Sequence, residues 1–150
     1  MKTIYLFRAP LFILLLIFMS PFQTSAQIDH RWQDWHKYEN NPVLSDNKTF
    51  FHDVLYEDDT YKMWFTVLDD GIGYAESSDG KIWNVFDTIV IPGGPVGSWD
   101  QRRWVSSVVR VDDTLRMHYM GVTPQCAFRI GYAYSIDGLN WTLKSLPVLQ

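Results

Sequence analysis

The sequence has little of several features that would identify common classes of protein. It contains one cysteine, Cys126, so no disulfide can form within the chain and packing alone must hold an exported fold. Acidic residues outnumber Lys and Arg by 17 to 13, and no basic run occurs, which argues against nucleic acid as a partner. The Cys and His residues lack zinc-site spacing. Nucleotide and phosphate motifs are also missing, so no redox cofactor is implied.

A long hydrophobic run is missing as well. The longest, Leu11–Met19, has about half the length that a membrane-spanning helix needs. It follows two basic residues and precedes the small residues Thr24-Ser25-Ala26, an order typical of a secretory signal peptide. We therefore predict a signal peptide over residues 1–26 and a mature chain of residues 27–150, secreted or periplasmic and free of the membrane after cleavage.

Aromatic residues are abundant, at 16% of the chain, with 7 Trp and 8 Tyr. Such a content is typical of an all-β protein, because aromatic side chains suit the pleated surface of a sheet. It is also typical of carbohydrate recognition, in which ring faces stack on sugars. The first interpretation requires no function.

An internal repeat organises the rest of the chain. The segment "IGYAESSDGKIW" (72–83) returns as "IGYAYSIDGLNW" (130–141), and "VLYEDDTYKMWFT" (54–66) returns as "VVRVDDTLRMHYM" (108–120). The offset is 54 residues for the second pair and 58 for the first, so the loop between them is longer in the second copy. Each Trp at the end of a unit leads to a proline-containing connector. A repeat of this length is typical of propeller blades.

Each unit is predicted to be a meander of about four antiparallel strands. In "YKMWFT" apolar and amphipathic side chains alternate, which indicates a strand with two different faces. Asp58-Asp59 and Asp112-Asp113 are predicted turns, and Asp79-Gly80 and Asp137-Gly138 are predicted two-residue hairpins. Small residues such as Gly73 should let another sheet pack closely. We favour the outer half of a propeller blade for each copy. A β-sandwich with a chance duplication is the alternative.

The order of motifs resembles a known family. The succession "NPVL", "DVLYEDDTYKMWFT", "IGYAESSDGKIW" and "GSWD" is similar to the five-bladed β-propeller glycoside hydrolases of family 43, with relatives in families 32 and 130. The resemblance covers about residues 32–150. It implies an all-β fold with two four-stranded antiparallel blades and the start of a third, as part of an incomplete five-bladed propeller. Some relatives hold a calcium ion in the channel, but no residue here specifies one.

The resemblance also implies candidate catalytic residues. Such enzymes place carboxylates on the innermost strand of successive blades, because one acid protonates the leaving oxygen while another activates water or attacks the sugar. Asp53 in "FFHDVLYE" falls at such a position, beside His52, a candidate for substrate binding. A solvated aspartate at a strand end is the alternative. Ser107 stands where relatives often carry the second acid, and its hydroxyl could bind a sugar hydroxyl instead.

The loop "GSWDQRRW" supplies the remaining candidates. It contains Asp100 as a second candidate catalytic acid, with Arg103 and Trp104 as candidate substrate-binding residues. An acid, guanidinium groups and indole rings would suit a sugar subsite. The alternative is a salt bridge within the loop, with the tryptophans packed between blades.

Three functions follow from the resemblance. The first is an exported glycosidase acting on poly- or oligosaccharides, of which this chain is the N-terminal part and whose proton donor comes from a later blade. The second is a non-catalytic carbohydrate-binding propeller fragment, favoured by the serines at 106 and 107. The third is a defective remnant. Fold analogy alone cannot choose among them.

Overall fold

The computed structural model describes residues 35–45 and 49–149. The predicted signal peptide lies outside these residues. The chain divides into two compact units, residues 1–36 and 37–150, and all that follows concerns the second. Eight strands make up its regular structure: β1 Thr49–Glu57, β2 Thr60–Val67, β3 Gly71–Ser77, β4 Asn84–Pro92, β5 Arg102–Val111, β6 Thr114–Val122, β7 Phe128–Ser135 and β8 Thr142–Leu143. No helix long and apolar enough to cross a membrane occurs in the described part of the chain.

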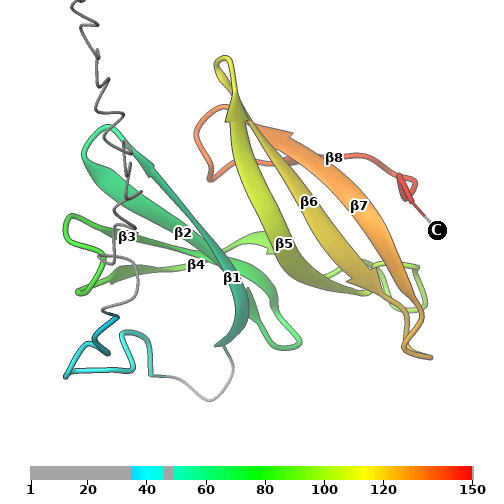
Figure 1. Ribbon diagram of the computed structural model, residues 1–150. Coiled ribbons are helices and arrows are strands. Elements are labelled where there is room, and N and C mark those ends of the chain that lie inside the picture. Colours follow the sequence, from blue (N-terminus) through cyan, green and yellow to red (C-terminus); the bar gives the residue numbers. More distant parts are fainter. Residues whose placement is uncertain (1–34, 46–48, 150) are drawn as a thin grey trace, which may run out of the picture. The chain divides into compact units, whose positions relative to one another are not determined.

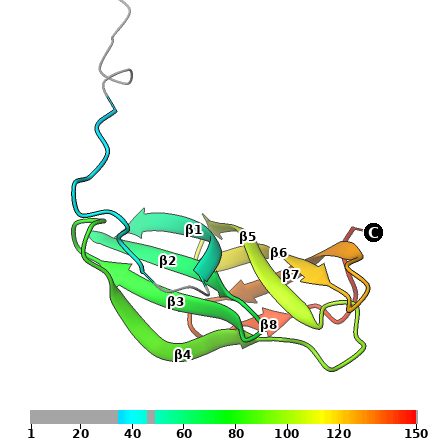
Figure 2. The ribbon, with the colours of Figure 1, turned by 90° about the horizontal axis from the view of Figure 1, so that it is seen from below.

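The strands form two antiparallel sheets of four strands each, in the orders β1-β2-β3-β4 and β5-β6-β7-β8 (Figures 1 and 2). Every neighbouring pair in a sheet is consecutive in the chain, so each sheet is a meander. The two sheets meet through β5, which contacts β1, β2 and β3. This arrangement confirms the predicted all-β fold with two four-stranded blades.

The repeat extends over all four strands of each sheet, so the prediction that it covers only the outer half of a blade is wrong. Ile72 pairs with Ile91 across β3 and β4, and Ile130 forms the equivalent bridge with Leu149. The offset of 58 residues is the same for both partners. Leu149 therefore stands, as an isolated bridge beyond β8, at the position that Ile91 holds in β4, and the first strand of a third sheet is not among the described residues.

The main core lies between the two sheets. The first sheet supplies Trp64, Ile72 and Tyr74, and the second supplies Leu115 and Met117, all at most 1% exposed. The alternation predicted for β2 places Trp64 on this face, away from Met63 and Phe65. The indole Nε1 of Trp64 donates a hydrogen bond of 2.8 Å to the carbonyl oxygen of Gly138.

The small residues of β3 and β7 make room for neighbouring side chains. A Cβ atom on Gly131 would lie 2.2 Å from Cζ of Tyr119, its partner on β6, and a Cβ on Gly73 would lie 2.8 Å from Cζ of Phe65. These glycines accommodate an aromatic ring from the neighbouring strand of their own sheet. In the second sheet the same small face also packs against the first sheet, because Ala133 is fully buried in the core between them, as predicted.

The turns follow the sequence in part. Asp58 and Asp59 adopt φ of 52° and 56° between β1 and β2, so the predicted turn there is confirmed. The prediction of a two-residue hairpin at Asp79-Gly80 is wrong, because a longer loop joins Ser77 to Asn84.

Two backbone hydrogen bonds explain this longer loop. The Asp79 carboxylate accepts the N–H groups of Ile82 at 2.9 Å and Lys81 at 2.8 Å, and these bonds, with that of Ile82 the larger contribution, lower the pKa of that carboxyl. Asp137 holds the equivalent loop in the second sheet through Leu139 and Asn140, and its pKa is lowered by the same kind of contact, Asn140 contributing most. An aspartate that caps backbone N–H groups organises a loop wider than a two-residue turn.

Candidate functional site

The candidate site begins on β1, the edge strand of the first sheet that contacts β5. Asp53 pairs in register with Trp64, so its side chain lies on the face that meets the second sheet. Its carboxylate accepts a hydrogen bond from the backbone N–H of Val108 on β5. Asp53 therefore lies on the edge strand that adjoins the second sheet, and one of its oxygens joins the two sheets.

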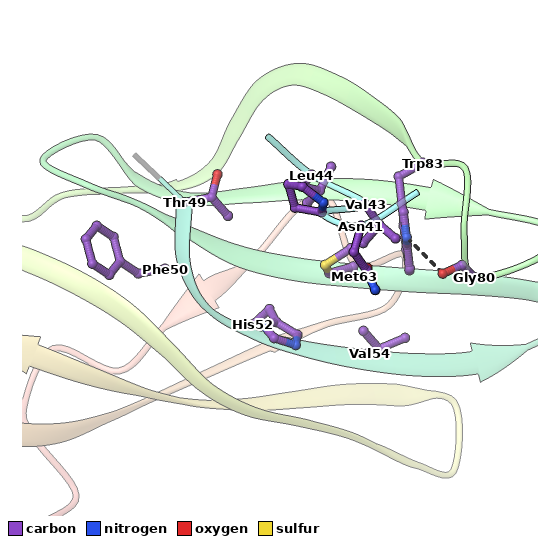
Figure 3. A pocket seen from close by; sticks show the side chains of 11 residues that line it. Asn41, Val43, Leu44, Thr49, Phe50, His52, Val54, Met63, Gly80 and Trp83 are labelled. Carbon is purple, nitrogen blue, oxygen red and sulfur yellow. Dashed lines mark hydrogen bonds between the residues drawn. The ribbon is translucent and has the colours of Figure 1, made fainter. Parts of the chain in front are cut away.

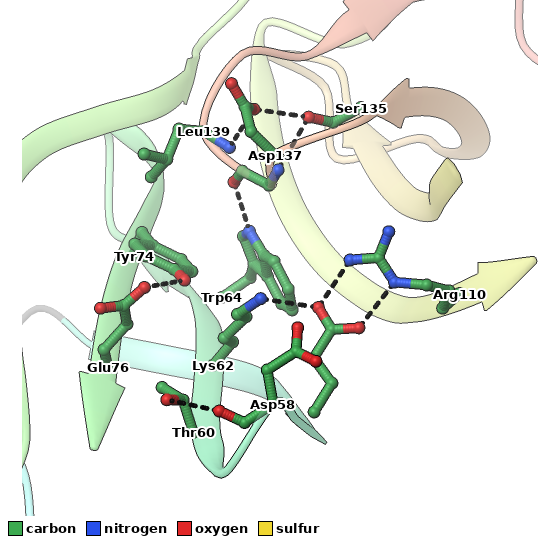
Figure 4. A network of polar contacts seen from close by, with 12 residues as sticks. Asp58, Thr60, Lys62, Trp64, Tyr74, Glu76, Arg110, Ser135, Asp137 and Leu139 are labelled. Carbon is green, nitrogen blue, oxygen red and sulfur yellow. Dashed lines mark hydrogen bonds and ion pairs between the residues drawn. The ribbon is translucent and has the colours of Figure 1, made fainter. Parts of the chain in front are cut away.

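A second carboxylate on β1 was not identified from the sequence. Glu57 accepts hydrogen bonds of 2.6 Å from both Nε and Nη2 of Arg110 on β5, and one of 2.8 Å from Nζ of Lys62 (Figure 4). These contacts, with that of Arg110 the largest, hold the pKa of Glu57 at about 2. A carboxylate so paired stabilises the contact between sheets and is a poor proton donor. Since the repeat aligns β1 with β5, a search for opposite charges on these strands would have found the pair.

The second inner strand offers hydroxyl groups in place of an acid. Ser106 and Ser107 are exposed on β5, and a β-bulge between Val105 and Ser107 leaves Ser106 without a partner in the ladder. Ser107 pairs with His118, as Asp53 pairs with Trp64 in the first sheet. Ser107 therefore occupies the position in the second sheet that Asp53 occupies in the first.

Asp100 lies in a different environment. It is 6% exposed, and its carboxylate accepts hydrogen bonds from Ser98 Oγ, Arg103 Nε and the Tyr119 hydroxyl, with an ion pair of 2.7 Å to Arg103. Val108, which contacts Asp53, stands six residues beyond the start of β5 at Arg102, or roughly 20 Å along the strand. Glycosidase carboxylates lie about 5 to 9.5 Å apart. The structure does not bring Asp53 and Asp100 together, and it favours the loop salt bridge for Asp100.

Arg103 and Trp104, although adjacent in the chain, make contacts with different parts of the structure. Arg103 also donates to the carbonyl oxygen of Pro92 at 2.7 Å, so its guanidinium links the loop to the end of β4. Trp104 lies between the rings of Phe51 and Phe128, with ring centroids 5.7 and 6.3 Å away. Its indole N–H is buried and has no hydrogen-bond partner among the described residues. Both phenylalanines are more than half-exposed, so this aromatic cluster is open to a stacking ligand.

His52 faces away from Asp53, because successive side chains of a strand point to opposite faces. It lines a pocket of about 520 Å³ on the other side of the first sheet, together with Phe50, Val54, Met63 and Trp83 (Figure 3). Segment 41–44 forms the far wall of that pocket. The predicted pair of His52 with Asp53 is therefore divided between two faces.

Among Asp53, Glu57 and Asp100, only Asp53 is bound by a backbone N–H and not by a guanidinium group. Asp53 has the placement, whereas Glu57 is held by Arg110 and Asp100 is buried beside Arg103. Hydrolysis of a glycosidic bond uses two carboxyl groups. Over residues 35–45 and 49–149, no cluster of three or more His, Cys, Asp or Glu residues could hold a metal ion.

Comparison with known proteins adds a fold similarity. No family model and no curated protein matches the chain. Solved structures of glycoside hydrolases do match, and two of the three described next are family-43 enzymes. Their β-propeller fold corresponds to the two sheets of this chain.

A glycosyl hydrolase from Bacteroides ovatus is 19% identical, with a TM-score of 0.55 over 65% of this chain and 31% of its own. A thermostable family-43 glycoside hydrolase is 17% identical, with a TM-score of 0.59 over 73% and 36%. A β-xylosidase/α-arabinofuranosidase of that family from a compost microbial metagenome, in complex with xylotriose, is 11% identical, with a TM-score of 0.59 over 71% and 37%. The chain thus spans about a third of the structures it matches. The resemblance to family 43 is borne out in the fold, and that to families 32 and 130 stays a prediction.

Proposed function

We propose that this chain is part of an exported glycoside hydrolase-like protein that acts on glycosidic bonds of poly- or oligosaccharides. Asp53 supplies one of the two carboxylates. The observation that carries the proposal is the position of Asp53, on the edge strand β1 and facing the second sheet, in a fold similar to that of family-43 glycoside hydrolases. Similar proteins bind xylotriose, which makes a pentose oligosaccharide the first substrate class to test.

A second carboxylate remains to be supplied. The described part of β5 carries Ser106 and Ser107 where an acid would be needed. In this proposal the proton donor comes from a further sheet of the complete protein. Residues 27–150 then form the first two blades, after removal of a signal peptide over residues 1–26.

The serines also favour a second candidate function. A propeller fragment with one carboxylate, exposed hydroxyl groups and an open cluster of Phe51, Trp104 and Phe128 can bind a sugar without cleaving it. Aromatic faces and hydroxyl groups suffice for such binding. This candidate predicts affinity for oligosaccharides with no release of product.

One experiment separates the two functions. Release of reducing sugar from xylo- and arabino-oligosaccharides is measured beside binding by titration calorimetry, for the complete protein that contains this chain and for its Asp53→Asn variant. Asparagine keeps an oxygen that accepts the Val108 N–H, so folding is retained, whereas alanine would remove that contact between sheets. The control is Asp58→Asn, in an exposed turn whose φ of 52° asparagine tolerates.

For the hydrolase we expect product release that Asp53→Asn lowers by about 10² to 10⁴, because the residue acts in proton transfer or attack. Binding should change little, and the control should match the unchanged protein. Binding without turnover would favour the carbohydrate-binding fragment. Equal turnover in Asp53→Asn would exclude Asp53 from the mechanism.

A further inference from the structure

A pocket of about 600 Å³ lies away from Asp53, where loops of the two sheets meet. Its walls come from the turn between β2 and β3, the connector between β4 and β5 (residues 93–101), the start of β5 and the loop between β6 and β7. Its lining includes Asp69, Gly93, Val96, Gln101, Arg102 and Pro124. All of these belong to the two described sheets and their loops, so the walls need no further sheet. We call it the connector pocket.

The motif "GSWDQRRW" (97–104) contributes to this pocket with residues other than those that the sequence suggested. Asp100 and Arg103 form an ion pair with each other, and Asp100 is buried. Gln101 and Arg102 lie between them in the chain and line the connector pocket instead. Val108, which binds Asp53, stands six residues beyond Arg102 on β5, or roughly 20 Å along the strand. The motif therefore supplies polar groups to a place distant from Asp53.

Hydrogen bonds hold the wall of the pocket that the connector forms. The Gly93 N–H donates to the carbonyl oxygen of Asp70 at 3.1 Å. The Gly94 N–H donates to the carbonyl oxygen of Asp100 at 3.1 Å. A side chain does not fit at Gly93, because its Cβ would lie 2.7 Å from the carbonyl oxygen of Gln101. Small-molecule sites are usually largely preformed, with volumes of about 300 to 1,000 Å³, and the connector pocket meets both conditions.

The donor groups at the pocket are only partly used within the protein. Arg102 donates from Nη2 to the carbonyl oxygen of Thr123 at 3.4 Å and lies 3.8 Å from Sγ of Cys126. Its other guanidinium N–H groups remain for a ligand. Gln101 accepts the Gly97 N–H at 2.7 Å through Oε1, so its amide NH₂ group remains to donate.

Asp69 supplies an acceptor from a different loop. Its backbone adopts φ of 68° in the turn between β2 and β3, and its side chain is exposed. In the described part of the chain its carboxylate forms no ion pair, so its charge is not neutralised by Arg102. A carboxylate only accepts hydrogen bonds and a guanidinium only donates them, whereas a hydroxyl group does both. Neighbouring hydroxyl groups of one ligand can therefore bind Asp69 and Arg102 together.

The two charges also disfavour charged ligands. Asp69 repels an anion that Arg102 would attract, and Arg102 repels a cation that Asp69 would attract. Val96 and Pro124 are exposed and add apolar surface that can contact the C–H groups of a sugar ring. A neutral ligand with several hydroxyl groups matches this combination.

We propose that the connector pocket is a second carbohydrate site, which binds sugar units of an oligosaccharide away from Asp53. The class of ligand rests on the proposed function, in which poly- or oligosaccharides are the substrates. Neighbouring sugar hydroxyls donate to Asp69 and accept from Arg102 and Gln101. A polysaccharide held here raises the concentration of its own neighbouring segments near Asp53, because one bound segment tethers the rest.

Titration calorimetry on the complete protein tests the pocket, with xylohexaose and arabinohexaose as probes. Arg102→Gln removes the guanidinium, and Asp69→Asn removes the carboxylate charge at a φ of 68° that asparagine tolerates. The double variant leaves the net charge unchanged, so its effect cannot arise from overall charge. Asp70→Asn makes the same change at an exposed neighbour that does not line the pocket, and serves as the control. Circular dichroism checks that each variant folds.

We expect each single substitution to weaken the binding of at least one probe about tenfold, because a hydrogen bond to a charged group is lost. The double variant should bind more weakly still, and Asp70→Asn should bind as the unchanged protein does. Excess inorganic phosphate should not compete with the sugar, because Asp69 disfavours an anion.

Three results would overturn the proposal: no binding of either probe by the unchanged protein, binding that neither substitution weakens, or competition by phosphate. The proposed hydrolase is judged separately, by product release in the same protein. Hydrolysis with no effect of Asp69→Asn or Arg102→Gln on binding would remove the pocket and keep the hydrolase. Weakened binding in these variants of a protein that releases no product would keep the pocket and remove the hydrolase.

Discussion

Replacing Glu57 by glutamine should weaken the contact between the two sheets in a manner that depends on pH. Glu57 binds Arg110 of the second sheet through two hydrogen bonds of 2.6 Å and Lys62 of its own sheet through one of 2.8 Å (Figure 4). Glutamine keeps the shape of the side chain but loses its charge. Arg110 and Lys62 would then lie beside a neutral side chain and would lose their common ion-pair partner.

The magnitude follows from the pKa of Glu57. The contacts lower it from 4.5 to about 2. At about 1.4 kcal/mol per pH unit, this corresponds to an upper limit of about 3 kcal/mol in the free energy of unfolding. The Arg110 side chain is 31% exposed and solvent screens the pair. We therefore expect a loss of about 1 to 2 kcal/mol near neutral pH.

The sign of the pH dependence is set by the lowered pKa. A carboxylate with a folded pKa below its unfolded value contributes its stability above the unfolded value, here 4.5, and loses it as the pH falls toward 2. Urea unfolding followed by tryptophan fluorescence at several pH values between 7 and 2 measures this. The unchanged protein and Glu57→Gln should differ at pH 7 and converge near pH 2.

The control for this prediction is Asp58→Asn, which removes the charge of the neighbouring carboxylate in the exposed turn. It should leave the unfolding free energy within about 0.5 kcal/mol of the unchanged protein. A difference between Glu57→Gln and the unchanged protein that is equal at pH 7 and pH 2 would refute the reasoning, as would no difference at pH 7.

Two further substitutions test the packing. Trp64→Phe should lower the unfolding free energy by about 1 kcal/mol, because it removes the hydrogen bond to Gly138 while Trp141 still satisfies that carbonyl, and an unchanged urea midpoint would contradict this. Gly131→Ala should lower the unfolding free energy by about 1 to 3 kcal/mol, since the new Cβ would lie 2.2 Å from the buried Tyr119 ring. A thermal midpoint of Gly131→Ala within about a degree of that of the unchanged protein would contradict this, because it would mean that the Tyr119 ring moves aside at no cost.

Much of the fold could be predicted because the relevant signals are local and occur twice. The alternation in "YKMWFT" decides which side chains share a face, and the Asp-Asp turn decides where β1 ends and β2 begins. The recurrence at offsets of 54 and 58 residues then implies two equivalent sheets. The placement of Asp53 on an inner strand came from the family resemblance instead, and the structure shows that its side chain lies on the face that meets the second sheet.

The loops after β3 and β7 were predicted less well. Asp-Gly is typical of a two-residue hairpin, but the Asp79 carboxylate binds backbone N–H groups two and three residues ahead and so holds a wider loop. An aspartate side chain can accept hydrogen bonds from several nearby backbone N–H groups. Which of them it binds depends on where the next strand begins, and the residue types alone do not determine that.

By itself, the sequence determined that this chain is all-β, built from two equivalent meanders, and similar to a family of propeller glycosidases. Only the tertiary structure decided which charged groups meet. It joined Glu57 to Arg110, bound Asp53 to the backbone of Val108, and buried Asp100 beside Arg103. The physical reason is that strand alternation follows from adjacent residues, whereas a contact between side chains of different sheets depends on how the two sheets pack.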